Sequence, residues 1–292
     1  MLTGKVVVVT GASSGIGYQA ALDFARAGAQ VIGVGRDQQR CNQAKERILA
    51  LWPDANITFL VADLASQAQV RGLASEIAGI LEVDHNGKLD VLVNNAGVYM
   101  GKRVLTEEGI ETTFAVNHLA PFLLTYLLLP HLAKTDDSRV ITISSDSHYN
   151  TWFIPRVEEK PFFYFGLWAY KVSKLSNILF TRRFNLMMNG NSPQAFAVDP
   201  GLVNTDIGLK GTGGLAQAVW RNRQKIGNSP EKPAKTILYL AETRGLNCVR
   251  NVYWHDCAPK QPSAAALNDK LTKRLWEESC SLCKIPSDWT PK

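Results

Sequence analysis

A short strand that runs directly into closely spaced glycines constrains this chain more than any other feature. Val6–Thr10 is apolar and β-branched, which predicts a buried strand, and Gly11, Gly15 and Gly17 follow it before a predicted helix at 18–27. A turn this tight needs residues without a Cβ where the backbone reverses. The start of the helix then offers free N–H groups and a positive dipole end to an anion such as a pyrophosphate. Glycines at one turn are weak evidence alone, because ordinary strand-to-helix turns use them too.

The same alternation of strand and helix continues to the end of the chain. Short apolar runs predict strands at 6–10, 31–34, 57–61, 89–93, 140–144, 195–198 and 251–254. Periodicity predicts helices at 18–27, 38–51, 67–81, 105–132 with a break near Asn117, 168–188, 233–241 and 267–282. Strands that are apolar on both faces and separated by helices indicate a parallel sheet covered on both sides. We therefore expect a single α/β domain over 1–292, a Rossmann fold whose doubly wound parallel sheet has about seven strands.

Composition excludes several classes of protein. The 292 residues are 46% hydrophobic, enough for a large core, and the net charge is +6. No basic run alternates with aromatic residues, so nucleic-acid binding is not expected. The five cysteines are an odd number, which indicates a reducing compartment and a cytoplasmic protein. Cys280 and Cys283 form a lone Cys-x-x-Cys, so we expect helix-face cysteines there and no metal site.

The sequence also predicts no transmembrane anchor. Its longest apolar stretch, 122–132, contains Pro130 and His131 and is shorter than the roughly 20 residues that a bilayer span needs. A predicted strand begins almost at Met1, so no signal peptide is expected.

Tyr170 and Lys174 form the second informative motif. They are four residues apart in the predicted helix 168–188, so both side chains lie on one face. A free phenol has a pKa of about 10, and a neighbouring ammonium favours the phenolate and lowers that value. Such a phenol could exchange a proton with a substrate oxygen. The spacing also fits an ordinary amphipathic pair, but Tyr170 is the only one of the eight tyrosines with a lysine four residues later.

Taken in order, these motifs resemble the short-chain dehydrogenase/reductase family. The matching segments are 10–17, 94–97, 170–174 and 200–205, spread over nearly the whole chain. The resemblance implies an oxidoreductase that transfers a hydride between nicotinamide C4 and a carbon bearing oxygen. It also implies that Tyr170 is the general acid in reduction and the general base in oxidation, and that Lys174 bonds the nicotinamide ribose.

The resemblance implies two further catalytic residues. Ser144 and Ser145 end the predicted fifth strand, where only one of two successive side chains can face a substrate. The family pattern places the catalytic serine second, which favours Ser145 and keeps Ser144 as the alternative. Asn117 matches the family asparagine that holds a proton-relay water beside the lysine. A satisfied amide in a bent helix is the other interpretation of Asn117.

The expected cofactor is NADP(H), with NAD(H) as the alternative. Arg36, after the predicted second strand, can pair with a 2′-phosphate, whereas Asp37 could instead bind the ribose of NAD. The remaining contacts are implied by the resemblance and lie in the glycine turn, at the ends of later strands and in the catalytic helix: Gly11, Ser13, Ser14, Gly15, Ile16, Gly17, Asp63, Leu64, Asn94, Ala96, Gly97, Tyr170, Lys174, Pro200, Gly201, Val203 and Thr205.

Two segments are expected to form the substrate end. The stretch 146–169 is rich in aromatic residues and indicates a wall for a bulky lipophilic small molecule, an alcohol, ketone or aldehyde. Plain packing, or a loop that covers the neighbouring helix, is an equal interpretation. The glycine-rich stretch 206–229 is similar to the family's substrate lid. Around 170–184 and 273–280 the chain most resembles the retinol-dehydrogenase-like branch. An insertion precedes helix 168–188, which forms the family's dimer interface, so both homodimer and monomer remain open.

Other functions are also compatible with parts of the sequence. An NAD(P)-binding scaffold that senses redox state without turnover is the main alternative, although it would not need the catalytic residues named above. Sugar epimerisation or dehydration in the same fold is disfavoured by the glycine spacing and the short C-terminal region.

Overall fold

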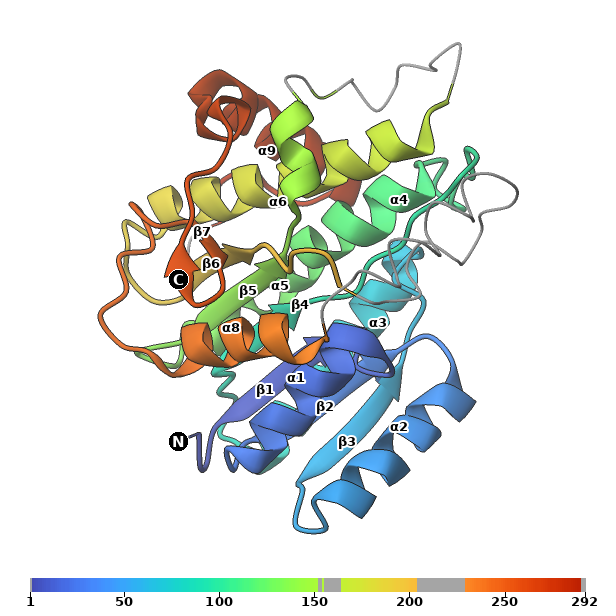
Figure 1. Ribbon diagram of the computed structural model, residues 1–292, viewed down its shortest axis with the longest axis vertical. Helices are drawn as coiled ribbons and strands as arrows, with labels where there is room; N and C mark the ends of the chain where they lie inside the picture. The colour runs from blue at the N-terminus through green and yellow to red at the C-terminus, as the bar shows by residue number, and fades with distance from the viewer. Residues whose placement is uncertain (1, 152–153, 155–163, 204–228, 290–292) are drawn as a thin grey trace.

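An eight-stranded sheet forms the centre of the molecule (Figure 1). The computed structural model describes residues 2–151, 154, 164–203 and 229–289. The strands lie in the order β3-β2-β1-β4-β5-β6-β7-β8, and every neighbouring pair is parallel except β7 with β8. Their bounds are Val6–Thr10 (β1), Gln30–Gly35 (β2), Ile57–Val61 (β3), Val91–Asn94 (β4), Arg139–Ile143 (β5), Gln194–Val198 (β6), Tyr253–His255 (β7) and Ala258–Pro259 (β8).

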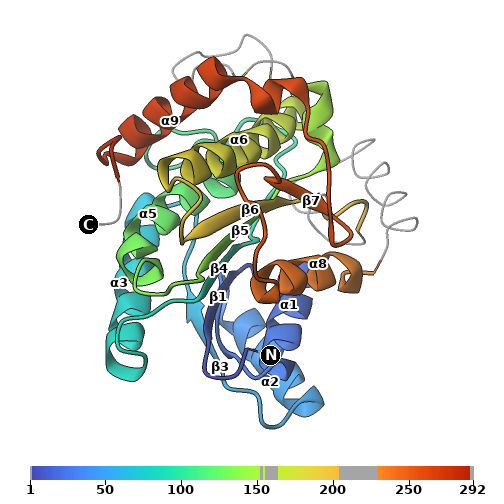
Figure 2. The ribbon, with the colours of Figure 1, turned by 90° about the vertical axis from the view of Figure 1, so that its left-hand side faces the viewer.

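Helices cover both faces of this sheet (Figure 2). α1, α2 and α8 lie on one face, while α3, α5 and α6 lie on the other, with α9 packed outside α6. The helical bounds are Gly15–Arg26 (α1), Gln38–Leu51 (α2), Gln67–Asp84 (α3), Thr112–Phe114 (α4), Ala115–Leu119 (η1), Ala120–Leu132 (α5), Asp146–Asn150 (η2), Gly166–Met187 (α6), Glu231–Glu242 (α8), Ala264–Leu267 (η4) and Asp269–Cys283 (α9).

Successive side chains of β1 enter different cores, as alternation along a strand requires. Val6 and Val8 pack with residues of α3, α5 and α6, whereas Val7 and Val9 pack with residues of α1, α2 and α8. A strand that is buried on both faces must be apolar at every position, which explains its continuous valine run. The expected doubly wound parallel sheet is confirmed, with a short antiparallel eighth strand at its edge.

The helix expected at 105–132 begins later than its sequence predicts. Leu105 forms a bridge with Glu111 across a turn in which Gly109 has a φ of +76°. The Glu111 side chain then caps the helix that starts at Thr112. The polar turn residues before Glu111 therefore belong to a connection and not to the helix.

The last strand is also displaced from its predicted position at 251–254. It runs over Tyr253–His255 and turns through Asp256 and Cys257 into β8. Both turn residues have positive φ, +51° and +61°. A two-residue hairpin turn of type I′ requires positive φ at both positions and usually uses Asn-Gly, so Asp-Cys carries no strong sequence signal for it.

The two expected substrate segments are only partly described. The proposed lid at 206–229 lies outside the described residues except for its last residue, Ser229. Of the stretch 146–169, the structure describes 146–151, 154 and 164–169. Its first part forms the short 3-10 helix η2 at Asp146–Asn150.

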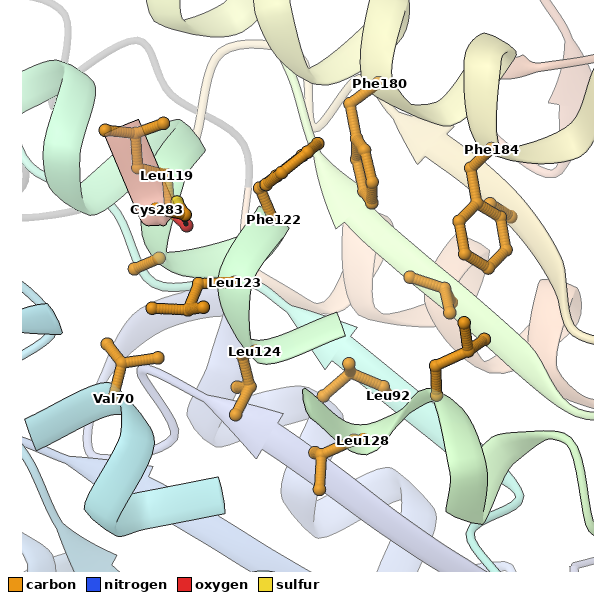
Figure 3. Packing of buried hydrophobic residues seen from close by; sticks show 14 of the residues in the cluster. Val70, Leu92, Leu119, Phe122, Leu123, Leu124, Leu128, Phe180, Phe184 and Cys283 are labelled. Carbon is orange, nitrogen blue, oxygen red and sulfur yellow. Dashed lines mark hydrogen bonds between the residues drawn. The ribbon is translucent and has the colours of Figure 1, made fainter. Parts of the chain in front are cut away.

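The predicted C-terminal helix is α9, which packs against α6. Figure 3 shows Phe122, Phe180 and Phe184 in the core between α5 and α6. Trp276 of α9 lies 5.0 Å from Phe122 between ring centroids, and it stacks on Trp289 at 4.5 Å. The α9 helix thus covers an apolar face of the long helix α6.

The described part of the chain contains neither a disulfide bond nor a cluster of metal-ligating side chains. Cys280 and Cys283 are free and buried on α9, and burial raises the pKa of both thiols. Among the described residues, no group of three metal-ligating side chains converges. Thr112–Leu132 is long and apolar enough to span a bilayer, but 83% of its apolar window is buried inside the fold, as in an ordinary core helix.

Candidate active site

A cleft of about 570 Å³ lies along the carboxyl ends of the strands. It is centred where β1 pairs with β2 on one side and β4 on the other, the point at which strand order reverses. Open α/β sheets bind ligands at such a point. Most of the predicted site residues line this cleft: Gly11, Ser13, Ser14, Gly15, Ile16, Arg36, Asp63, Leu64, Ala96, Gly97, Ser144, Ser145, Tyr170, Lys174, Pro200, Gly201 and Val203.

The glycine turn is held together by contacts that leave no room for side chains. A Cβ on Gly17 would lie 2.4 Å from the Gly11 carbonyl oxygen and 2.3 Å from Asn95 Nδ2. Gly17 does not line the cleft, and its lack of a Cβ lets α1 approach the turn closely. Gly11 and Gly15 have φ values of +70° and +59°, which favour glycine. The turn thus needs Gly11 and Gly15 for their positive φ and Gly17 for the close approach of the backbone.

The N-terminus of α1 faces the cleft with its first N–H groups free of a side-chain cap. Its N-cap residue, Ser14, makes no capping hydrogen bond, unlike Asp37 at α2 and Ser66 at α3. The first four N–H groups of a helix lack partners within the helix. The start of α1 therefore suits a bound phosphate group.

Two arginines lie at the β2 end of the cleft. The exposed Arg36 and the partly buried Arg40 both line it. The Asp37 carboxylate accepts a hydrogen bond from Arg40 N at 2.8 Å and so caps α2. Sequence reasoning missed Arg40, although its position in the first turn of the helix after Arg36 was a signal for it. Gly35 is required locally, because its Cβ would lie 2.4 Å from Cys41 Sγ.

Asn94 and Asn95 point in different directions at the end of β4, and sequence reasoning named only Asn94. Asn94 is 2% exposed, does not line the cleft, and donates from Nδ2 to Thr125 Oγ1 at 3.1 Å. Asn95 does line the cleft, and its Nδ2 donates to Thr10 O at 2.8 Å. Successive side chains at a strand end point in opposite directions, so only one of the pair can reach the ligand side. Asn94 therefore does not line the cleft, and its contact with the cofactor stays a prediction.

Tyr170 and Lys174 meet at the floor of the cleft. Lys174 is 2% exposed, and its Nζ donates to Ile143 O at 3.0 Å. The same Nζ lies 5.5 Å from the centroid of the Tyr170 ring. Burial lowers the pKa of Lys174 from 10.5 to about 8. The Tyr99 ring meets Tyr170 edge-on, with 6.1 Å between centroids.

The two serines at the end of β5 have different surroundings. Ser144 is fully buried, and its hydroxyl donates to the Lys174 carbonyl at 2.7 Å. Ser145 is partly exposed in the cleft, and its Oγ accepts from Ser147 N at 3.2 Å. Because the Ser145 oxygen acts as an acceptor there, its O–H can still donate to a substrate oxygen. The geometry supports Ser145 over Ser144.

Asn117 lies in the π-helical turn η1, which is the break predicted in this helix. Its Oδ1 accepts from Val98 N at 2.7 Å, and its Nδ2 donates to Val98 O at 3.0 Å and to Ser173 Oγ at 3.0 Å. The side chain is 1% exposed and does not line the cleft. Asn117 therefore ties the strand-end loop to α6, and its role in proton relay stays a prediction. Thr205 lies outside the described residues.

Apolar side chains surround the end of the cleft near Tyr170. Met100, Leu167 and Leu202 line it, and the two leucines are 44% and 55% exposed. The neighbouring Tyr164 donates from its hydroxyl to Glu111 Oε1 at 2.9 Å. That bond joins the end of the stretch 146–169 to the start of α4. The described part of this mouth is thus apolar with a few tethered polar groups.

Together these groups can bind a phosphate-bearing ligand along the glycine turn and exchange a proton at its other end. Comparison with known proteins identifies the family. Residues 5–210 match the family model described as short chain dehydrogenase. The chain is 34% identical over 289 residues to mouse retinol dehydrogenase 11, covering 99% of this chain and 89% of that protein.

Two further relatives agree with that match. Mouse retinol dehydrogenase 12 is 36% identical over 286 residues, covering 97% of this chain and 88% of that protein. The crystal structure of an uncharacterized protein from Mycobacterium paratuberculosis superposes with a TM-score of 0.73 at 28% identity, covering 97% of this chain and 95% of that one. The chain, with its glycine turn and its Tyr170–Lys174 pair in one cleft, belongs to the short chain dehydrogenase family, on its retinol-dehydrogenase-like branch.

Proposed function

We propose that this oxidoreductase uses NADP(H) to interconvert a lipophilic alcohol and its ketone or aldehyde. The observation that carries the proposal is the convergence of Tyr170, Lys174 and Ser145 at one end of a cleft whose other end holds Arg36 and Arg40. One end can handle a proton, and the other can bind a phosphate. The bound nicotinamide would supply or accept the hydride.

The residues along the cleft suit a dinucleotide with a 2′-phosphate. The uncapped start of α1 can bind the pyrophosphate, and two guanidinium groups can bind the extra phosphate. NAD would instead need a free carboxylate for its ribose hydroxyls. The carboxylate at that position, Asp37, caps α2 through Arg40 N. These contacts favour NADP over NAD.

Tyr170 would donate a proton to the carbonyl oxygen in reduction and remove one from the alcohol in oxidation. The Lys174 ammonium, 5.5 Å from the ring, favours the phenolate through its positive charge. The Ser145 hydroxyl would donate a hydrogen bond to the same substrate oxygen and stabilise its charge in the transition state. The bond from Lys174 Nζ to Ile143 O holds this positive charge in place.

The cleft mouth and the relatives both support a lipophilic substrate. Leu167, Leu202 and Met100 would contact an apolar chain or ring. The relatives at 34% and 36% identity are named retinol dehydrogenases. A retinoid, or an alcohol of similar size and apolarity, is therefore the first substrate to test.

Cofactor choice can be tested by measuring dissociation constants for NADPH and NADH with wild type, Arg36→Ala and Arg40→Ala. Loss of a charged hydrogen bond costs about 1.5–3 kcal/mol, which is roughly a 10- to 100-fold weaker binding of NADPH with no change for NADH. Arg250→Ala removes an exposed arginine outside the cleft and serves as the matched control. Equal binding of both cofactors, unchanged by the cleft substitutions, would contradict the NADP assignment.

Tyr170→Phe tests the chemistry separately from binding. An enzyme should keep its affinity for NADPH and lose turnover by roughly 10²- to 10⁴-fold. A wild-type chain that binds NADPH but oxidises or reduces no member of a panel of retinoids and lipophilic carbonyls would favour the redox-sensing scaffold.

A further inference from the structure

Lys260 joins two loops that border the reacting end of the cleft. Its Nζ lies 2.7 Å from Asp199 Oδ2 and 2.5 Å from Asp146 Oδ1. Asp146 directly follows Ser145 after β5. Asp199 follows β6 and directly precedes Pro200, which lines the cleft. One ammonium therefore connects the loop that carries the serine to the loop that carries the Pro-Gly turn.

Asp199 is the most buried member of this network. Its side chain is 0% exposed, whereas that of Lys260 is 28% exposed. Burial alone would raise the pKa of Asp199, but hydrogen bonds from Lys260 and from Gly201 N hold it below the usual range. Asp199 is thus a buried carboxylate, and a buried charge needs a partner close by.

The same carboxylate shapes the turn beside the cleft. Asp199 Oδ1 accepts from Gly201 N at 3.0 Å, and Gly201 has a φ of +68°. His255 lies on the other side, with its Nδ1 3.0 Å from Asp199 O and 3.4 Å from Asp199 Oδ2. Lys260 therefore orients a carboxylate that in turn fixes the backbone of the Pro200-Gly201 turn.

The segment after β8 also supports the other loop through His148. Ser263 N donates to His148 Nε2 at 3.1 Å, so the proton of the neutral ring is on Nδ1 and is donated to Ser145 O at 2.8 Å. Lys260 itself is anchored by its N–H, which donates to Tyr253 O at 2.8 Å. Residues 260–263 thus bind the serine loop at Asp146 and at His148.

We propose that Lys260 is a positioning residue for hydride transfer. Its ammonium sets the distance between Ser145, which would bond the substrate oxygen, and the Pro200-Gly201 turn, which would border the nicotinamide. This inference rests on the proposed function. Lys260 does not line the cleft, so it acts through Asp146 and Asp199.

Lys260→Met tests the positioning role. The double variant Lys260→Met with Asp199→Asn distinguishes a loss of positioning from a loss of fold stability. The single variant leaves Asp199 buried without its ammonium partner and is expected to melt at a lower temperature. The double variant removes both charges, while the amide oxygen of the introduced asparagine can still accept from Gly201 N. We expect its melting temperature to return toward that of wild type. Lys232→Met, which breaks the exposed pair with Asp256 at 3.2 Å, is the matched control.

Measurements of kcat and of the binding of NADPH and 2′,5′-ADP distinguish an effect at the reacting end of the cleft from one at the adenosine end. Both Lys260 variants should lower kcat and weaken NADPH binding by roughly 10- to 100-fold, because small displacements at a reacting centre have effects of this size. Both should bind 2′,5′-ADP, which lacks the nicotinamide, as wild type does. Lys260→Arg keeps a cation between the two carboxylates and should recover most of the activity.

Each outcome decides between the two proposals. A double variant with wild-type kcat and NADPH affinity would overturn the positioning role and leave Lys260 as a neutraliser of Asp199. Weakened 2′,5′-ADP binding in the variants would also overturn it, since the effect would then not be confined to the reacting end. Wild-type protein that binds no NADPH, or binds it without any turnover, would instead contradict the proposed function.

Discussion

Replacing Lys174 with methionine should stabilise the fold while abolishing turnover. The side chain is 2% exposed, and burial lowers the pKa of its ammonium from 10.5 to about 8. The difference of 2.5 (10.5 − 8) corresponds to about 3 kcal/mol at 1.36 kcal/mol per pKa unit. Losing the bond from Nζ to Ile143 O offsets about 1 kcal/mol of this. Asn177 Nδ2 still donates to that carbonyl at 3.1 Å, so the net gain should be about 2 kcal/mol.

The stability advantage of Lys174→Met over wild type should shrink as the pH rises, because burial lowers the pKa of the lysine. Below pH 8 the lysine is charged in both the folded and the unfolded chain, so the folded state bears the full cost of burying the charge. Between about pH 8 and 10.5 the folded state has already released the proton while the unfolded state still binds it. Wild-type stability therefore rises with pH relative to the variant across this window.

Urea unfolding followed by tryptophan fluorescence at pH 7 and pH 9.5 would measure both effects. For a chain of this length, about 2 kcal/mol raises the melting temperature by about 3 °C. Lys171→Met changes a partly exposed lysine on the same helix and should leave the pH profile of wild type unchanged. A Lys174→Met variant that is less stable than wild type at pH 7, or whose advantage does not shrink toward pH 9.5, would contradict this role of the buried ammonium.

Four further predictions concern single side chains and the assembly state. Gly17→Ala should prevent cofactor binding and destabilise the fold, because the added Cβ would lie 2.4 Å from a backbone oxygen. Gly72 lies in open space on α3, so Gly72→Ala should stabilise the fold by about 0.5–1 kcal/mol, as measured by thermal melts. Ser145→Ala should lower kcat by roughly 10²-fold or more, while Ser144→Ala should mainly lower the melting temperature, since its hydroxyl bonds the α6 backbone. Burial lowers the pKa of His118 from 6.5 to about 4, so protonation of this ring should cost the fold about 3 kcal/mol as the pH falls from 6.5 to 4. His118→Gln should lack this loss, which urea titrations at the two pH values would measure. Because α9 covers α6, sedimentation should give the mass of one chain, and a dimer would show that another face mediates assembly.

Local periodicity was sufficient to predict the fold and to pair Tyr170 with Lys174, whereas most other site residues came from the resemblance to a known family. Strands buried on both faces must be apolar throughout, so Val6–Thr10 and its counterparts could be recognised one at a time. The Tyr170–Lys174 pair was equally local, because four residues make about one helical turn. The glycine spacing after the first strand also spans only a few neighbouring residues, so it could be recognised in the sequence.

The three-dimensional structure supplied the physical basis for choosing between neighbouring residues, although the family pattern already favoured Ser145 over Ser144. Asn94 and Asn95 are alike in chemistry, and only the direction of β4 decides which one reaches the cleft. The serines at the end of β5 depend in the same way on α6, whose backbone accepts the Ser144 hydroxyl bond. No spacing along the chain encodes these directions.

Contacts between distant segments were beyond any sequence period. Lys260 is 61 residues from Asp199 and 114 from Asp146, and the three meet only because β5, β6 and the β7–β8 hairpin lie side by side in the sheet. The covering of α6 by α9 arises in the same way from packing of apolar faces. The sequence by itself determined the elements and the chemistry carried on single elements. Tertiary structure decided which elements bring charged side chains together, because burial and pairing depend on all the neighbours at once.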